Sequence, residues 1–156
     1  MKAIVYTKYG GPEVLQLKEI EKPSPKEDEV LIKVLAASIN DWDFGLLEGD
    51  LINRLLNGIL KPKRKILGSD IAGRIEAVGK NVTKFKTGDD VYGDLSGYWG
   101  GFAEYTCARE KSLALKPAAM SFEEAAAIPQ AAMLAVQGLI DKGKIHPGQK
   151  LLINGA

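Results

Sequence analysis

The sequence predicts a mainly β domain with helices, of the α+β class, built around a small, partly open antiparallel barrel. Three observations predict it. Short strand-like patterns fill residues 2–39, a glycine-punctuated block runs from Gly68 to Tyr105, and alanine-rich helical patterns follow Ser121. The glycine-punctuated block is the most informative of the three, because Gly-Asp turns separate its short strands.

The first third of the chain is expected to begin the barrel. Strand patterns cover residues 2–7, 14–20 and 30–38. They are separated by the Gly10-Gly11-Pro12 turn and by the polar turn over residues 23–28. Their long-range pairing is expected to begin the barrel.

Two short helices are expected next. One turn is predicted over Asp41–Leu47, and an amphipathic helix with Asp50 as its N-cap over Asp50–Leu60. The favoured interpretation packs this helix on the barrel and leaves the basic residues 61–65 in solvent. A lid over a substrate cleft comes second, and contact with an anionic membrane third, because ten residues give little membrane affinity. The expected apolar stripe consists of Leu51, Ile52, Leu55, Leu56 and Ile59.

Within the glycine-punctuated block, the small residues have predicted roles. Gly73 and Gly79 let a strand bend or let another backbone approach closely, and Gly88-Asp89 forms a tight turn because glycine adopts positive φ without steric cost. Four apolar residues can face a core: Ile71, Ile75, Ala77 and Val91.

The C-terminal part reads as helices followed by one strand. Ser121 is expected to start an alanine-rich helix, Pro129 to interrupt it, and residues 131–142 to form a second helix. Residues 150–153 have a strand pattern that runs into Gly155-Ala156, which is how a nucleotide-binding β-α-β unit begins.

Composition limits the function classes. The 156 residues carry 21 Lys and Arg against 20 Asp and Glu, so a nucleic-acid partner is not expected. No run of eighteen apolar residues and no apolar leader occurs, so we expect no membrane partner and a cytoplasmic location. The single cysteine, Cys107, excludes an internal disulfide and is expected to be a buried apolar residue rather than a nucleophile. The single histidine, His146, is expected at the solvated surface.

Several ordered motifs resemble the medium-chain dehydrogenase/reductase superfamily, in its zinc-free quinone oxidoreductase branch. They are the opening Met1–Tyr6, the Gly10–Leu15 turn, the strand Val30–Ile39 and the run from Gly68 to Val91, so the resemblance covers nearly the whole chain. It implies a GroES-like catalytic domain over residues 1–128. Residues 129–156 would be a connecting helix and the first strand of a truncated Rossmann domain.

The resemblance also bears on metal binding. Zinc-dependent members of the superfamily hold the metal with cysteine, histidine and cysteine or carboxylate, but this chain has Asn40, Ser69 and Gln130 at the corresponding positions. Neutral amides and a hydroxyl are poor zinc ligands, so no metal is expected. A hard cation shared by Asp43 and Asp70 is the less favoured alternative.

By resemblance, the whole enzyme reduces quinones, enones or related carbonyls by hydride transfer from NADP or NAD. Asn40 would be catalytic and would hold a carbonyl oxygen or the cofactor carboxamide, with helix capping as its alternative role. Asp43 would support the site from behind the residues that contact the ligand, and Asp70 would accept hydrogen bonds in a structural role. Substrate contacts are expected from Asn40, Trp42 and Leu46, and cofactor contacts from Asn40, Gln130, Leu134 and Gly155.

Two other functions stay open at this point. One is a zinc-dependent alcohol dehydrogenase, and the other is a non-enzymatic GroES-like binding module. For the favoured function, the chain alone is expected to be inactive and to bind nicotinamide nucleotides feebly, because the phosphate-gripping turn lies beyond it. A homodimer of the longer enzyme, the choice between NAD and NADP, and the substrate are left open.

Overall fold

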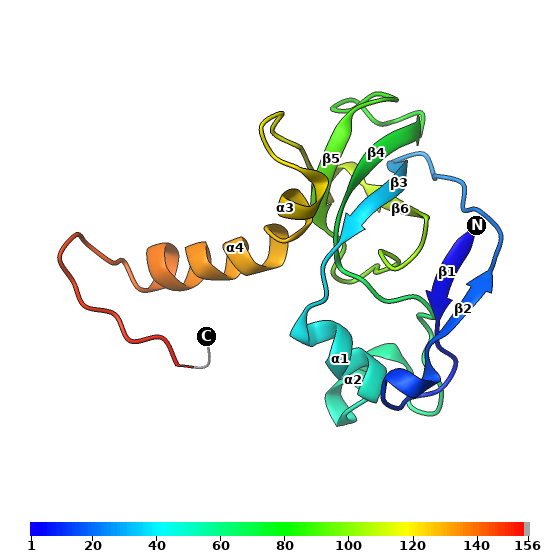
Figure 1. Cartoon of the computed structure of the whole chain (residues 1–156), viewed down its shortest axis with the longest axis horizontal. Coiled ribbons are helices and arrows are strands. Elements are labelled where there is room, and N and C mark those ends of the chain that lie inside the picture. Colours follow the sequence, from blue (N-terminus) through cyan, green and yellow to red (C-terminus); the bar gives the residue numbers. More distant parts are fainter. Residues whose placement is uncertain (155–156) are drawn as a thin grey trace.

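Two antiparallel sheets with flanking helices make up the computed structural model, which describes residues 1–154 (Figure 1). β1 (Lys2–Val5) pairs with β2 (Gln16–Glu19). The second sheet has the order β6-β3-β4-β5-β7, and all of its neighbours are antiparallel. Its strands are β3 (Glu29–Ala37), β4 (Asp70–Val78), β5 (Asp90–Asp94), β6 (Tyr105–Arg109) and β7 (Leu113–Leu115).

The two sheets are joined along the segment before β6. The Ile4 N–H donates to the Phe102 carbonyl at 2.9 Å, and the Glu104 N–H donates to the Lys2 carbonyl at 3.0 Å. Within residues 1–154 the five-stranded sheet does not close on itself. The predicted α+β class is therefore confirmed, and the predicted barrel is open.

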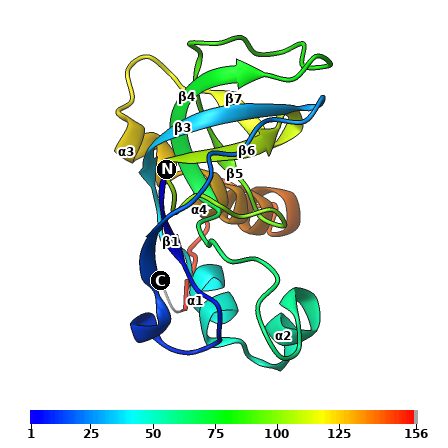
Figure 2. The ribbon, with the colours of Figure 1, turned by 90° about the vertical axis from the view of Figure 1, so that its right-hand side faces the viewer.

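The helices lie at two places around the large sheet. α1 and α2 sit together below it in both views (Figures 1 and 2), whereas α4 projects to one side in Figure 1. Among the described residues, no helix is long and apolar enough to cross a membrane. The helical elements are η1 (Pro12–Val14), α1 (Asp41–Glu48), α2 (Leu51–Asn57), η2 (Glu110–Ser112), α3 (Phe122–Ala126), α4 (Pro129–Ala135) and the π-helical η3 (Val136–Lys142).

Two apolar clusters form the main core. The first lies on the inner face of β3, β4 and β5, where Ile71, Ile75 and Val91 are fully buried, as predicted. Ala77 is half-buried. The second cluster lies under β1 and α1 and contains Tyr6, Val14, Leu46, Leu47, Leu67 and Trp99.

The close approaches predicted at glycines are present. A Cβ on Gly73 would overlap the carbonyl oxygen of Lys33 on the paired strand, and a Cβ on Gly79 would overlap that of Lys26. Gly88 has φ +93°, the left-handed conformation that its turn requires. Of the three, Gly73 pairs with Val34 and stands next to the register shift between Val34 and Ala36 of β3.

The helix boundaries follow the capping signals. The Asn53 N–H donates to Asp50 Oδ1 at 2.8 Å, and Ser121 and Glu124 form a capping box, so both predicted N-caps are confirmed. The last helix begins at Pro129 rather than at residue 131. Proline is favourable there because it stands at the first helical position, where no N–H is needed.

Two expectations are wrong. The apolar stripe of α2 does not pack on the barrel, since Leu51, Leu55 and Leu56 are 76%, 66% and 59% exposed while Asn57 is fully buried. Residues 150–153 form no strand, and they run through solvent without a pairing partner among the described residues. A strand pattern needs a neighbouring strand to satisfy its backbone groups.

Candidate active-site cleft

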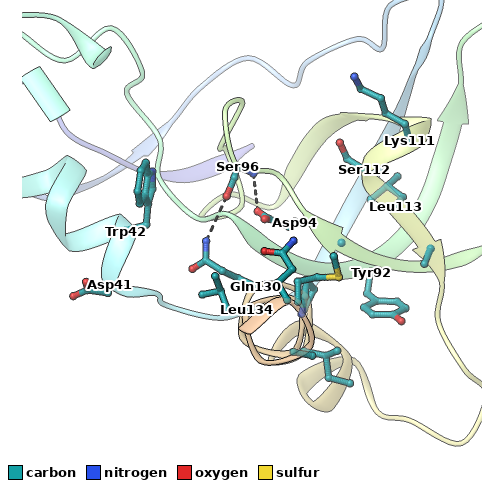
Figure 3. Close-up of a pocket in the computed structure, with 17 residues that line it drawn as sticks. Asp41, Trp42, Tyr92, Asp94, Ser96, Lys111, Ser112, Leu113, Gln130 and Leu134 are labelled. Atoms are coloured by element: carbon teal, nitrogen blue, oxygen red, sulfur yellow. Dashed lines mark hydrogen bonds between the residues drawn. The ribbon is translucent and has the colours of Figure 1, made fainter. Parts of the chain in front are cut away.

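A cleft of about 820 Å³ lies between the start of α1, strand β5 and helix α4. Figure 3 shows Asp41 and Trp42 on one side of it, Tyr92 and Leu113 on the other, and Gln130 and Leu134 between them. The wall is largely apolar, with a few polar groups at its edges. Its principal lining residues are Trp42, Tyr92, Ser96, Gln130, Met133 and Leu134.

Asn40 stands between β3 and α1, one residue before the cleft wall. Its amide Nδ2 donates to Ser69 Oγ at 3.2 Å and, more weakly, to Ser38 Oγ at 3.5 Å. Asn40 is also the N-cap of α1 and forms a capping box with Asp43, so the alternative role of helix capping is confirmed. In the capping box the Asn40 side-chain oxygen accepts from the Asp43 N–H, and its second lone pair can accept a hydrogen bond from a ligand.

Asp43 holds Asn40 in place from within the protein. The carboxylate is 3% exposed. Its Oδ2 accepts from the Asn40 N–H at 3.0 Å, and its Oδ1 accepts from the Gly68 N–H at 2.9 Å. Burial raises the pKa of Asp43, and the two backbone donors oppose that shift. Asp43 thus connects the start of α1 to the segment that leads into β4.

Asp70 anchors the opposite wall. It is fully buried, and its Oδ2 accepts from the Gln130 N–H at 2.9 Å, which confirms the predicted role as a hydrogen-bond acceptor. Burial raises the pKa of Asp70 to about 6. Oδ1 has no hydrogen-bond partner among the described residues. The contact fixes the first turn of α4 against β4. The next turn of the same helix carries the cleft residues Met133 and Leu134.

The three positions at which zinc-dependent relatives place ligands lie together. Asn40 hydrogen-bonds to Ser69, and Asp70, the neighbour of Ser69, hydrogen-bonds to the backbone of Gln130. In residues 1–154 no group of three or more His, Cys, Asp or Glu side chains could hold a metal ion. What converges here is a set of amide, hydroxyl and buried carboxyl groups.

The structure brings some predicted site residues to the cleft and leaves others away from it. Trp42, Gln130 and Leu134 line it, with Trp42 46% and Leu134 63% exposed. Leu46 is only 1% exposed and packs in the core, so the structure does not place it where substrate contact was expected. Gly155 lies outside the described residues.

Sequence reasoning missed Tyr92, Ser96, Lys111 and Met133, which also line the cleft. Tyr92 carried a usable signal. The alternation along β5 buries Val91 in the core and therefore turns Tyr92 to the opposite face. Lys111 lies in a short turn after β6 and has no local signal that points to a cleft.

Two residues judged non-catalytic lie away from the cleft. His146 is exposed, as predicted. Cys107 on β6 is half-buried rather than fully buried, and burial raises the pKa of its thiol to about 11. The thiol therefore stays protonated near neutral pH, where it is a poor nucleophile.

The sequence and the fold are similar to those of known proteins. Residues 26–118 match the family model described as the alcohol dehydrogenase GroES-like domain. The chain is 41% identical to a 2-methylene-furan-3-one reductase of Solanum lycopersicum, over 99% of this chain and 40% of that protein. It is 39% identical to a chloroplastic NADPH-dependent alkenal/one oxidoreductase of Arabidopsis thaliana, over 100% of this chain and 41% of that protein.

The fold is also similar to that of a solved structure. The quinone oxidoreductase from Coxiella burnetii superposes with a TM-score of 0.85 and 32% sequence identity, covering 95% of this chain and 46% of that one. The chain thus spans less than half the length of these three proteins.

Proposed function

Since the chain belongs to the alcohol dehydrogenase GroES-like domain family, within the medium-chain dehydrogenase/reductase superfamily, we propose that it is the substrate-facing part of a metal-independent reductase. The reaction is hydride transfer from NADPH or NADH to a quinone, enone or related carbonyl. In this proposal residues 1–128 form the catalytic domain, and residues 129–156 lead into a nucleotide-binding domain.

The observation that carries the proposal is the hydrogen bond between Asn40 and Ser69 at 3.2 Å, beside the Asp70–Gln130 contact. The side chains of Asn40, Ser69 and Gln130 are neutral, and two of them already bond to each other. Zinc in proteins is held by thiolates, imidazoles and carboxylates, so this donor set supports chemistry without a catalytic zinc. The names of the similar proteins, reductases of a furanone and of alkenals and an oxidoreductase of quinones, support the substrate class.

The cleft suits the nicotinamide end of a dinucleotide together with a flat acceptor. Trp42 and Leu134 offer apolar surface, and Gln130 adds a polar group beside Leu134. The bound nicotinamide supplies the hydride. Asn40 Oδ1 would accept a hydrogen bond from a carboxamide N–H, and Asp43 would fix the Asn40 backbone through its N–H. Trp42 and Leu134 would exclude water from the reacting atoms.

An assay of Asn40 tests the proposal in the protein encoded by the complete reading frame. Oxidation of NADPH is followed with a quinone and with a 2-alkenal as acceptors. We expect Asn40→Ala to lower kcat/KM by about 100-fold, because the orienting hydrogen bond is lost. Asn81→Ala is the matched control, since Asn81 is exposed and contacts Glu27 far along the sheet. Equal activity of both variants would count against the proposal.

A further inference from the structure

Helix α2 is held with its polar side toward the protein. Asn57 is fully buried, its Nδ2 donates to the Tyr6 hydroxyl at 2.9 Å, and its Oδ1 accepts from the Arg64 N–H at 3.0 Å. The Tyr9 hydroxyl donates to the Gly58 carbonyl at the end of the helix. Buried polar networks of this kind specify one orientation, because any rotation of the helix would leave their groups unpaired.

The opposite side of the helix presents apolar side chains to solvent. Monomeric proteins rarely expose so many large apolar residues in one short segment unless something binds there. None of these side chains lines the cleft between α1, β5 and α4, so a lid over that cleft is not supported. The residues, with exposures from 59% to 88%, are Leu51, Ile52, Leu55, Leu56, Ile59 and Leu60.

The same segment is strongly cationic. Between residues 51 and 65 there are five Lys and Arg residues and no Asp or Glu. Lys61, Lys63 and Lys65 directly follow the apolar residues and are exposed, and among the described residues none of the three forms a salt bridge. Adjacent apolar and cationic side chains are the composition of a segment that lies in the interface of a bilayer with anionic lipids.

We propose that this α2 surface, the six apolar residues together with Lys61, Lys63 and Lys65, rests on an anionic lipid bilayer as a reversible peripheral contact. The apolar side chains enter the headgroup boundary, and the lysines meet lipid phosphates. A second copy of the chain fits this surface less well, since a two-fold contact would bring the same lysine cluster close to itself. The shortness of the helix is offset by Ile59, Leu60 and the lysines, which extend the surface beyond α2.

Vesicle co-sedimentation of the 156-residue chain tests the proposal, with phosphatidylcholine vesicles compared with vesicles that also contain phosphatidylglycerol. We expect binding to the anionic vesicles only, and weaker binding at about 0.5 M salt. Leu55→Glu/Leu56→Glu should reduce affinity at least about tenfold. Lys61→Gln/Lys63→Gln should reduce it about 25-fold, as two steps of about fivefold each. Circular dichroism checks that the variants stay folded.

The matched control is Leu151→Glu/Leu152→Glu, which places the same charges on the other exposed apolar segment of the chain. This control should bind like the unmodified chain. The proposal is overturned if the α2 variant binds as well as the unmodified chain, if only the control loses binding, or if no anionic vesicle is bound. A dimer that Leu55→Glu/Leu56→Glu dissociates, without vesicle binding, would assign the surface to a second copy instead.

Discussion

Asp70 is the residue on which the position of the cleft wall depends most directly. Its carboxyl group is fully buried and holds the first turn of α4 through the Gln130 N–H. Burial raises its pKa to about 6, so the folded chain binds a proton more tightly than the unfolded chain between about pH 4 and pH 6. The contribution of Asp70 to stability is therefore full below this window and is lost as the pH rises through it.

Asp70→Asn should remove that dependence while keeping an oxygen that can accept from Gln130. The variant should match the unmodified chain in free energy of unfolding near pH 4. Above pH 7 it should be more stable by roughly 2–3 kcal/mol, because no charge is buried. Urea denaturation at both pH values measures the difference. If the two proteins differ in free energy of unfolding by the same amount at both pH values, the pKa of Asp70 is not raised in the folded chain.

Gly73 is required where β3 and β4 pair closely. A side chain there would overlap the Lys33 carbonyl oxygen and approach Ile32 Cγ2 within 2.8 Å. Gly73→Ala should therefore cost roughly 2–4 kcal/mol of unfolding free energy. Gly138→Ala is the control, because a Cβ there meets nothing within 4 Å and should be neutral or slightly stabilising. Similar results for both variants in thermal unfolding would contradict this strand geometry.

At the scale of elements, local signals predicted where helices begin, because capping acts over three or four residues. Ser121 is not part of the apolar core, but its hydroxyl accepts a hydrogen bond from the Glu124 N–H at 3.1 Å. Ser121→Ala should cost about 1 kcal/mol of unfolding free energy. Ser24→Ala, in an exposed loop, should change it by less than about 0.5 kcal/mol. Denaturant midpoints measure both, and equal effects would mean that the cap does not stabilise α3.

The orientation of α2 could not be predicted in the same way. Periodicity shows that a helix has two unlike faces, and the usual assumption turns the apolar face inward. Here the inward face is selected by Asn57 and its partner Tyr6, which is 51 residues away in the sequence. A polar contact at that separation leaves no local pattern. Residues 150–153 show the reverse case. Their sequence has a strand pattern, but no strand within residues 1–154 pairs with them.

For the whole molecule, the α+β class and the antiparallel pairing of the strands could be predicted from alternation, Gly-Asp turns and family motifs, but the order of the strands was not predicted. The cleft could be predicted only in part. Trp42, Gln130 and Leu134 were predicted from the resemblance, and Tyr92 could have been predicted from the alternation along β5. Lys111 reaches the cleft through the folding of distant segments and has no local signal. Leu46 was misplaced because spacing along α1 does not tell which of its side chains enters the core.

The central claim is that these residues form the acceptor side of a hydride-transfer enzyme that needs no metal. The most direct measurement is NADPH oxidation with a quinone acceptor by the protein from the complete reading frame, before and after exhaustive chelation, together with its metal content. We expect less than stoichiometric zinc and the same turnover in both samples. Stoichiometric zinc, with activity lost on chelation and restored by zinc alone, would contradict it.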